Sequence, residues 1–189
     1  MAGMQREIST VRLRLRRWLP SDRAPFAALN ADRRVMEYFP APLSREESDT
    51  AADRIEAHFE AHGFGLWAVE IPGTTAFAGF IGLAVPRFEA HFTPCVEIGW
   101  RLATTHWGRG YATEGARAAL EFGFDVLELP EIVSLTARGN VRSRRVMERI
   151  GMARRAADDF EHPLIARDHP LAPHVLYRAT RRSSGAAPA

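Results

Sequence analysis

The run of apolar residues from Ala76 to Val85 constrains the fold more than any other feature of the sequence. Nearly every side chain in it is apolar, so an extended segment would have to bury both faces, as a strand does in the middle of a covered sheet. The run is too short to cross a bilayer as a helix, which takes about 20 apolar residues. We therefore expect a central strand with a layer of structure on each side.

The segments around this run supply the rest of such a layered domain. Strands are expected at residues 10–17, 64–71, 93–102, 131–137, about 153–160 and 174–180, and helices at about 21–39, 45–62, 110–127 and 140–150. Ser44 and Glu47 have the spacing of a capping box, and Gly63 is a stop signal for the helix they begin. This order predicts an α/β (mixed α+β) fold with a single central mixed sheet and helices on both faces.

Length and composition bound the organisation of the chain. Its 189 residues are 46% hydrophobic and 25% charged, which predicts one globular domain, 1–181, followed by a disordered tail, 182–189. A net charge of only +2 argues against a nucleic-acid binder. One cysteine, Cys95, and no Cys/His cluster predict neither a disulfide nor a metal site. With no signal-like or membrane-spanning segment, we expect a cytoplasmic protein without a membrane partner.

Two charged patterns allow more than one interpretation. Strict alternation in residues 10–17 predicts a half-buried strand with Val11, Leu13 and Leu15 inside and Arg12, Arg14 and Arg16 in solvent. These arginines, with those at 142–149, are also the basis of a nucleic-acid-binding alternative. The helix after Ser44 carries an acidic stripe, which is either a solvated face or an entrance for a cationic amine: Glu46, Asp49, Asp53, Glu56 and Glu60.

The segment HWGRGYATEG, residues 106–115, is the most informative for function. It lies between an expected strand and an expected helix, and Gly108 and Gly110 permit backbone conformations that a Cβ would block. The first amides of the helix have no partner within it and carry the positive end of its dipole. The segment therefore predicts an anion cradle suited to a pyrophosphate, to which Arg109 and Arg117 could add charge.

This segment resembles the coenzyme A pyrophosphate loop of the GNAT superfamily of N-acetyltransferases. The family's loop maps onto Trp107, Gly108, Arg109, Gly110, Tyr111 and Ala112, with Thr113 following, and Trp107 replaces the usual Gln or Arg. The Trp-Gly-x-Gly-Tyr-Ala-Thr-Glu form is similar to the RimJ/RimL-like branch, the ribosomal-protein N-terminal acetyltransferases. The resemblance implies a GNAT-like fold, with a largely antiparallel sheet, over most of the chain.

A second resemblance covers residues 131–152, where a strand leads into Asn140, Ser143 and a helix that ends at Gly151. In the family this strand diverges from the preceding one, and the pantetheine arm lies in the gap. The resemblance implies that Asn140 holds the arm and that Ser143 lies near the sulfur. By themselves, Asn140 would be a helix cap and Ser143 a small residue under the sheet. Met147 stands where many members carry a Tyr that protonates the departing thiolate, so the acid is Ser143, water or nothing.

The strand VEIGWRL, residues 96–102, carries a candidate base. Alternation places Glu97, Gly99 and Arg101 on one face, and burial of Glu97 would raise its pKa toward the range of a general base. Pairing with an arginine or exposure to solvent is the alternative. In similar family members a Glu here abstracts the amine proton. The resemblance also implies that a strand amide near Trp100 to Leu102 stabilises the oxyanion.

The implied activity is acetyl transfer from acetyl-CoA to a primary amine by direct attack, without a protein nucleophile or a metal. Alternatives are a CoA-binding sensor that has lost catalysis, or an enzyme that uses another donor such as succinyl-CoA. The acceptor is open between a small molecule and a protein N-terminus, and a homodimer is compatible with the sequence. Four C-terminal residues are candidates for the acceptor pocket or for plain loop positions: Asp159, His162, His169 and His174.

Overall fold

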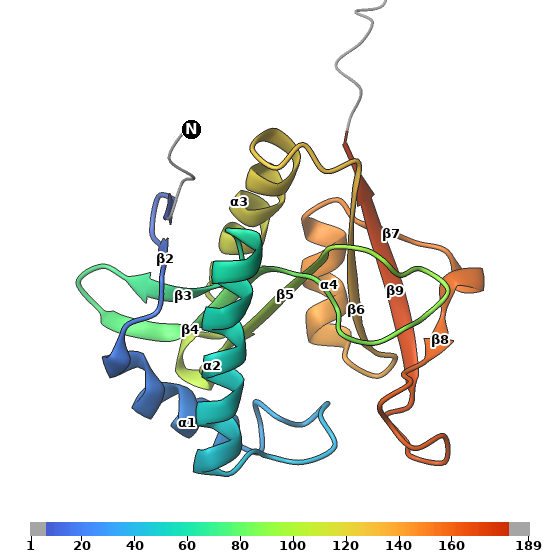
Figure 1. Cartoon of the computed structure of the whole chain (residues 1–189), viewed down its shortest axis with the longest axis horizontal. Coiled ribbons are helices and arrows are strands. Elements are labelled where there is room, and N and C mark those ends of the chain that lie inside the picture. Colours follow the sequence, from blue (N-terminus) through green and yellow to red (C-terminus); the bar gives the residue numbers. More distant parts are fainter. Residues whose placement is uncertain (1–6, 182–189) are drawn as a thin grey trace, which may run out of the picture.

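The computed structural model describes residues 7–181 (Figure 1), so the expected tail lies outside the described residues. The strands are β1 (Ile8–Ser9), β2 (Arg14–Arg16), β3 (Leu66–Ile71), β4 (Thr75–Ala84), β5 (Glu97–Leu102), β6 (Glu131–Ala137), β7 (Ala153–Arg154), β8 (Phe160–Glu161) and β9 (Pro173–Thr180). The helices are α1 (Arg23–Ala31), α2 (Arg45–His62), α3 (Tyr111–Asp125) and α4 (Val141–Arg149). Short 3-10 turns cover Pro20–Asp22, Thr104–His106 and Ala156–Asp158.

One sheet joins all of these strands in the order β1-β2-β3-β4-β5-β6-β9-β7, with β8 also on β9. Every pairing is antiparallel except that of β5 with β6, which is parallel. The apolar run is the central strand β4, and its residues 77–83 are buried. The expected mixed α/β fold with a largely antiparallel sheet is therefore confirmed.

Helices cover both faces of the sheet. On one face, Phe26 of α1 packs edge-on against Phe80 of β4, with ring centroids 6.0 Å apart. On the other face, a Cβ placed on Gly115 of α3 would lie 2.5 Å from Cδ1 of Ile81 of β4, so the glycine lets the helix pack close to the sheet without displacing that side chain. In the described residues 7–181, no helix is long and apolar enough to cross a membrane.

The N-terminal strand is shorter than expected, and its alternation is broken. The chain bends after β1, so Val11 is 97% exposed instead of buried, while Arg16 is 4% exposed instead of solvated. Arg16 forms two hydrogen bonds to Asp22, at 2.7 and 2.9 Å, and one to Glu70 at 3.1 Å. The prediction holds at Leu13, Leu15, Arg12 and Arg14 and fails at Val11 and Arg16. It fails there because period-two alternation holds only while the backbone stays extended, and because paired carboxylates make an arginine tolerable in the interior.

Helix boundaries were predicted well where a local cap exists. Ser44 accepts a hydrogen bond from the Glu47 N–H at 3.1 Å, the Glu47 carboxylate accepts from the Ser44 N–H at 2.7 Å, and Gly63 adopts a left-handed φ of 74°. The helix expected at 21–39 is instead α1, ending at Ala31, followed by turns to Pro40. This segment has no comparable stop signal at Ala31, and the turns after α1 border a pocket.

Candidate functional site

A cavity of about 780 Å³ lies where β5 and β6 separate. The two strands share one register pair, Glu97 with Val133, supported by a bond from the Val133 N–H to the Val96 C=O and one from Ser134 Oγ to the Ile98 C=O, both 2.9 Å. In the described parts of the strands no register pair follows, so a gap opens beyond Ile98, and the diverging strands can be followed in Figure 1.

Backbone amides of β5 face this gap. The Ala103 N–H donates to the Ala78 C=O of β4 at 2.9 Å. Because N–H groups alternate between the two edges of a strand, those of Trp100 and Leu102 point away from β4 and toward the gap. Both residues line the cavity, so an extended group inserted between the strands would meet unpaired donors.

The N-terminus of α3 forms one wall of the same cavity. Gly108 and Gly110 adopt left-handed φ values of 72° and 81°, and the first helical hydrogen bond joins the Glu114 N–H to the Gly110 C=O at 3.0 Å. The N–H groups of Tyr111, Ala112 and Thr113 therefore have no partner within the helix. With the helix dipole, these free N–H groups give the start of α3 the geometry that the predicted anion cradle requires.

Two side chains that flank the cradle hold it in shape. The Trp107 indole N–H donates to the Leu102 C=O at 2.8 Å, which ties the loop to the end of β5. Arg12 donates to the Arg109 C=O at 3.0 Å, pairs with Glu114 at 2.6 Å, and stacks 4.7 Å from the centre of the Tyr111 ring. The change from the family's Gln or Arg to Trp107 thus leaves the loop anchored.

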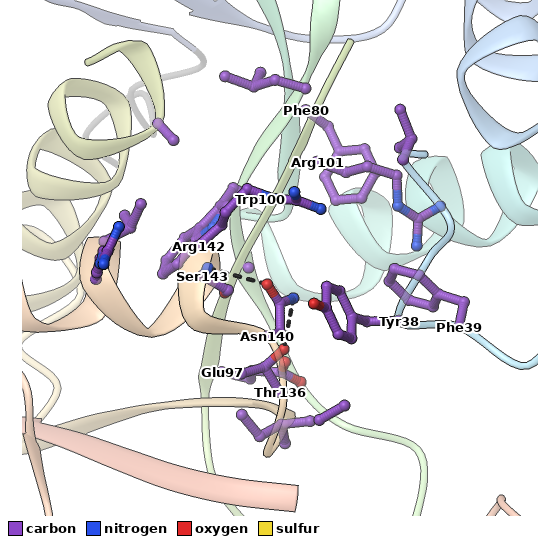
Figure 2. A pocket seen from close by; sticks show the side chains of 18 of the residues that line it. Tyr38, Phe39, Phe80, Glu97, Trp100, Arg101, Thr136, Asn140, Arg142 and Ser143 are labelled. Atoms are coloured by element: carbon purple, nitrogen blue, oxygen red, sulfur yellow. Dashed lines mark hydrogen bonds between the residues drawn. The ribbon is translucent and has the colours of Figure 1, made fainter. Parts of the chain in front are cut away.

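The N-terminus of α4 forms the opposite wall (Figure 2). Asn140 caps the helix, since its Oδ1 accepts from the Ser143 N–H at 3.1 Å, and its Nδ2 donates to Thr136 Oγ1 at 3.0 Å. The cap interpretation is therefore confirmed, and the same residue also lines the cavity, as does Ser143. Three arginines of α4 line this wall as well: Arg142, Arg145 and Arg149.

Glu97 lies at the point where the strands separate, and its side chain lines the cavity. Burial raises the pKa of Glu97 to about 7. No arginine pairs with it among the described residues, in contrast to the paired carboxylates elsewhere in the fold. A carboxyl group with such a pKa is about half ionised at neutral pH and can accept a proton there.

The other half of the cavity lies on the α1 and α2 face and is mainly aromatic. Tyr38 and Phe39 come from the turns after α1, Phe80 comes from β4, and Arg101 comes from the same face of β5 as Glu97. Figure 2 shows the Tyr38 hydroxyl directed toward Asn140, and Arg101 beside Phe39 and Phe80. The two halves meet at the gap between β5 and β6.

The structure brings nearly all of the predicted site residues into this one cavity. Every predicted donor-site and catalytic residue lines it except Arg109 and Arg117, whose side chains are exposed outside it. His162 and His174 line it, whereas Asp159 and His169 do not. Met147 is 1% exposed and belongs to the core. None of the acidic-stripe residues of α2 lines the cavity; several pair with arginines outside it, such as Asp53 with Arg23 at 2.5 Å.

Neither the Cys95 thiol nor a cluster of metal ligands adds a reactive group to the site within residues 7–181. Burial, and then the nearby Glu97 charge, raises the pKa of the Cys95 thiol to about 11, so it is protonated at neutral pH and a poor nucleophile. Within residues 7–181, no group of three or more His, Cys, Asp and Glu side chains is placed to hold a metal ion.

Several lining residues were not predicted as site residues from the sequence: Tyr38, Phe39, Phe80, Arg101 and Arg142. Arg142 ties both halves together, since it pairs with Glu37 and lies 4.6 Å from the centre of the Trp107 ring. These residues lie in a turn, a short loop or ordinary strand and helix positions, and only the tertiary fold brings them to the cavity. The one available signal was the alternation that places Arg101 on the face of Glu97.

Comparisons with known proteins agree with this geometry. Residues 12–153 match the sequence profile of the family described as an acetyltransferase (GNAT) domain. The Bacillus subtilis protein YkkB is 33% identical over 147 residues, which is 77% of this chain and 84% of YkkB. The N-acetyltransferase YnaD of Bacillus subtilis is 31% identical over 78% of this chain and 82% of its own length. An acetyltransferase crystal structure from Agrobacterium tumefaciens superimposes with a TM-score of 0.73 at 28% identity, covering 92% of this chain and 93% of its own.

Proposed function

Because the chain belongs to the GNAT acetyltransferase family and is an acyl-CoA-dependent N-acetyltransferase, we propose that it transfers acetyl from acetyl-CoA to a primary amine within a ternary complex. The observation that carries the proposal is the position of Glu97. Its carboxyl group lines the same cavity as the α3 cradle and the gap between β5 and β6.

We propose that acetyl-CoA lies along the two cavity walls formed by the N-termini of α3 and α4. Its pyrophosphate would accept hydrogen bonds from the N–H groups of residues 111–113, where the helix dipole favours negative charge. The arginines of α4 at the rim, Arg145 and Arg149, would meet further phosphate charge. The Arg-rich face of α4 therefore supports a phosphate-bearing small molecule, and a nucleic acid is not needed to account for it.

The acyl transfer is proposed to be direct. The neutral amine attacks the thioester carbonyl, a backbone N–H of Trp100 or Leu102 stabilises the oxyanion, and Glu97 takes the amine proton directly or through water. The C–S bond then breaks, and the thiolate is protonated by Ser143 or by solvent. No acyl-enzyme is formed, which agrees with the raised pKa of the Cys95 thiol.

Initial-rate kinetics test this mechanism. Thiol release is measured while acetyl-CoA and an accepted amine are both varied. Intersecting lines in the double-reciprocal plot are expected for a ternary complex, and parallel lines would contradict direct transfer. Saturable acetyl-CoA binding without turnover of any amine would instead support the alternative, a CoA-binding module without catalysis.

The amine acceptor, the cellular location and the oligomeric state are proposals that separate experiments test. The form of the loop at 107–114 supports placing the chain near the RimJ/RimL-like branch, which makes a protein N-terminal amine one candidate acceptor. Mass spectrometry of peptides offered with acetyl-CoA tests this candidate. A cytoplasmic location and a homodimer remain predictions from the sequence, to be checked by cell fractionation and light scattering.

A further inference from the structure

Arg101 presents a charge in the pocket that the protein does not neutralise. Its Nη1 donates to Asn30 Oδ1 at 2.5 Å, and its guanidinium lies 4.2 Å from the centre of the Phe39 ring and 5.3 Å from that of Phe80. Its Nε is buried without a hydrogen-bond partner. Among the described residues, no carboxylate forms an ion pair with it.

This arrangement differs from that of Arg16, which is 4% exposed. Arg16 is surrounded by Asp22 and Glu70, which offset the cost of removing its charge from water. Arg101 has only the neutral amide of Asn30, which is itself held by a bond from its Nδ2 to Ser48 Oγ at 2.9 Å. Burial lowers the pKa of Arg101 to about 10, and the group is still protonated at neutral pH. A fixed, uncompensated guanidinium facing a cavity is the chemistry that recognises an anion.

We propose that Arg101 binds a carboxylate of the acceptor, so that the substrates of this enzyme are amines that also carry a carboxylate. The inference rests on the proposed acetyl transfer and narrows its acceptor. Candidates by chemistry are amino acids and short peptides with a free C-terminus. The Phe39 and Phe80 rings beside the guanidinium favour acceptors with an apolar or aromatic body.

The position of Arg101 on the strand supports the acceptor as the source of the carboxylate. Arg101 lies on the same face of β5 as Glu97, the proposed base for the acceptor amine. The Cα atoms of Glu97 and Arg101 are about 13 Å apart, because a strand rises ~3.3 Å per residue. Gly99 lies between them, and a Cβ added there would meet no atom within 4 Å. This face of β5 therefore presents, in order along the strand, the proposed base Glu97, open space at Gly99 and the cation of Arg101.

The charges around the cavity argue against polycationic acceptors. Glu97 is the one carboxylate among the described residues that line it. Of the five arginines that line it, Arg34 and Arg142 pair with Asp32 and Glu37, and Arg145 and Arg149 are assigned to the donor phosphates, so Arg101 is the cation left to face the acceptor. A polyamine would need several carboxylates to replace its hydration. A zwitterionic or anionic amine meets no such penalty.

Matched acceptor pairs test the proposal. Thiol release is measured with acetyl-CoA for L-phenylalanine against phenethylamine, and for the dipeptide Ala-Phe against its C-terminal amide. Wild type is expected to favour the carboxylate member in kcat/KM. In Arg101→Gln that preference should fall by about 10- to 100-fold, the effect of losing one charge-assisted contact, mainly through KM. The ratio of the two kcat/KM values within each pair is compared between wild type and Arg101→Gln, so differences in amine basicity cancel.

Two further variants separate binding from structure. Asn30→Asp places a carboxylate against Arg101 and is expected to reduce the carboxylate preference while Arg101 stays in place. Arg138→Gln removes an exposed arginine outside the cavity and should leave the preference unchanged. Circular dichroism and Tm establish folding; if Arg101→Gln unfolds, Arg101→Lys and Asn30→Asp carry the test.

The outcomes are distinguishable. Turnover of amines with equal efficiency for both members of each pair would overturn this inference and leave the acetyltransferase proposal intact. The carboxylate could also belong to the acyl donor. If wild type prefers succinyl-CoA to acetyl-CoA and Arg101→Gln abolishes that preference, the acceptor assignment is overturned. Failure of every amine, despite acetyl-CoA binding, would reject the proposed catalysis on which this inference rests.

Discussion

Replacing Glu97 with Gln is expected to stabilise the protein at neutral pH and to impair catalysis. Burial raises the pKa of Glu97 from 4.5 to about 7. The folded state therefore holds the proton more tightly than the unfolded chain does. Between pH 4.5 and 7 the folded protein binds more protons, so its stability falls as pH rises through this window. The full penalty is present above pH 7 and absent below pH 4.5.

The size of the effect follows from these values. The difference between 4.5 and about 7 corresponds to about 3 kcal/mol of stability at pH 8, since one pKa unit is worth ~1.4 kcal/mol. The neutral amide of Glu97→Gln mimics the protonated carboxyl group and escapes the penalty. The variant should then exceed wild type by about 3 kcal/mol at pH 8, or about 6–12 °C in Tm for a domain of this size. At pH 4.5 the difference should nearly vanish.

Urea unfolding of both proteins at pH 4.5, 6 and 8 measures this directly, and thiol release measures catalysis in parallel. Wild-type activity should fall below pH 7 as Glu97 is protonated, and Glu97→Gln should lose about 10²- to 10⁴-fold in kcat at pH 8, the usual contribution of a general base. If the stability difference between wild type and Glu97→Gln does not change with pH, the conclusion that burial raises the pKa of Glu97 is refuted. Full activity of Glu97→Gln would remove Glu97 as the base.

The remaining predictions concern the donor side of the site. Gly110→Val forces a left-handed φ of 81° on a branched residue at the cradle and should weaken acetyl-CoA affinity at least about 10-fold by calorimetry, while Gly73→Val, equally left-handed but in the β3–β4 turn, should affect stability alone. Ser143→Ala should cost less than about 10-fold in kcat, because a thiolate leaves readily and solvent can protonate it; complete loss would show that Ser143 is essential. Arg145→Gln combined with Arg149→Gln should raise the KM for acetyl-CoA with little change in kcat, and an unchanged KM would contradict their assignment to the phosphates.

Much of this site could be predicted from sequence because its signals are local. The cradle depends on two glycines before a helix, and the Asn140 cap depends on a residue three positions away. Glu97 was found through strand alternation, and Figure 2 shows it beside Thr136 and Asn140, which come from a distant part of the chain. These predictions needed only the near neighbours of each residue along the chain.

The acceptor half could not be predicted in the same way. Tyr38 and Phe39 lie in turns after α1 that carry no motif, and Arg101 becomes unusual only when the fold shows that Asn30, rather than a carboxylate, contacts it. Arg16 and Val11 exchanged their expected environments because the chain bends between β1 and β2. Such features depend on which elements pack together, and this information is spread over the whole sequence.

A calorimetric titration of the protein with acetyl-CoA, with succinyl-CoA as the control, tests directly whether the α3 cradle binds the acyl donor. Saturable binding of acetyl-CoA with one site per chain is expected, clearly tighter than that of succinyl-CoA, with a loss of affinity in Gly110→Val. Absence of binding to either compound would contradict this expectation, because the cradle at the N-terminus of α3 would then be an ordinary turn.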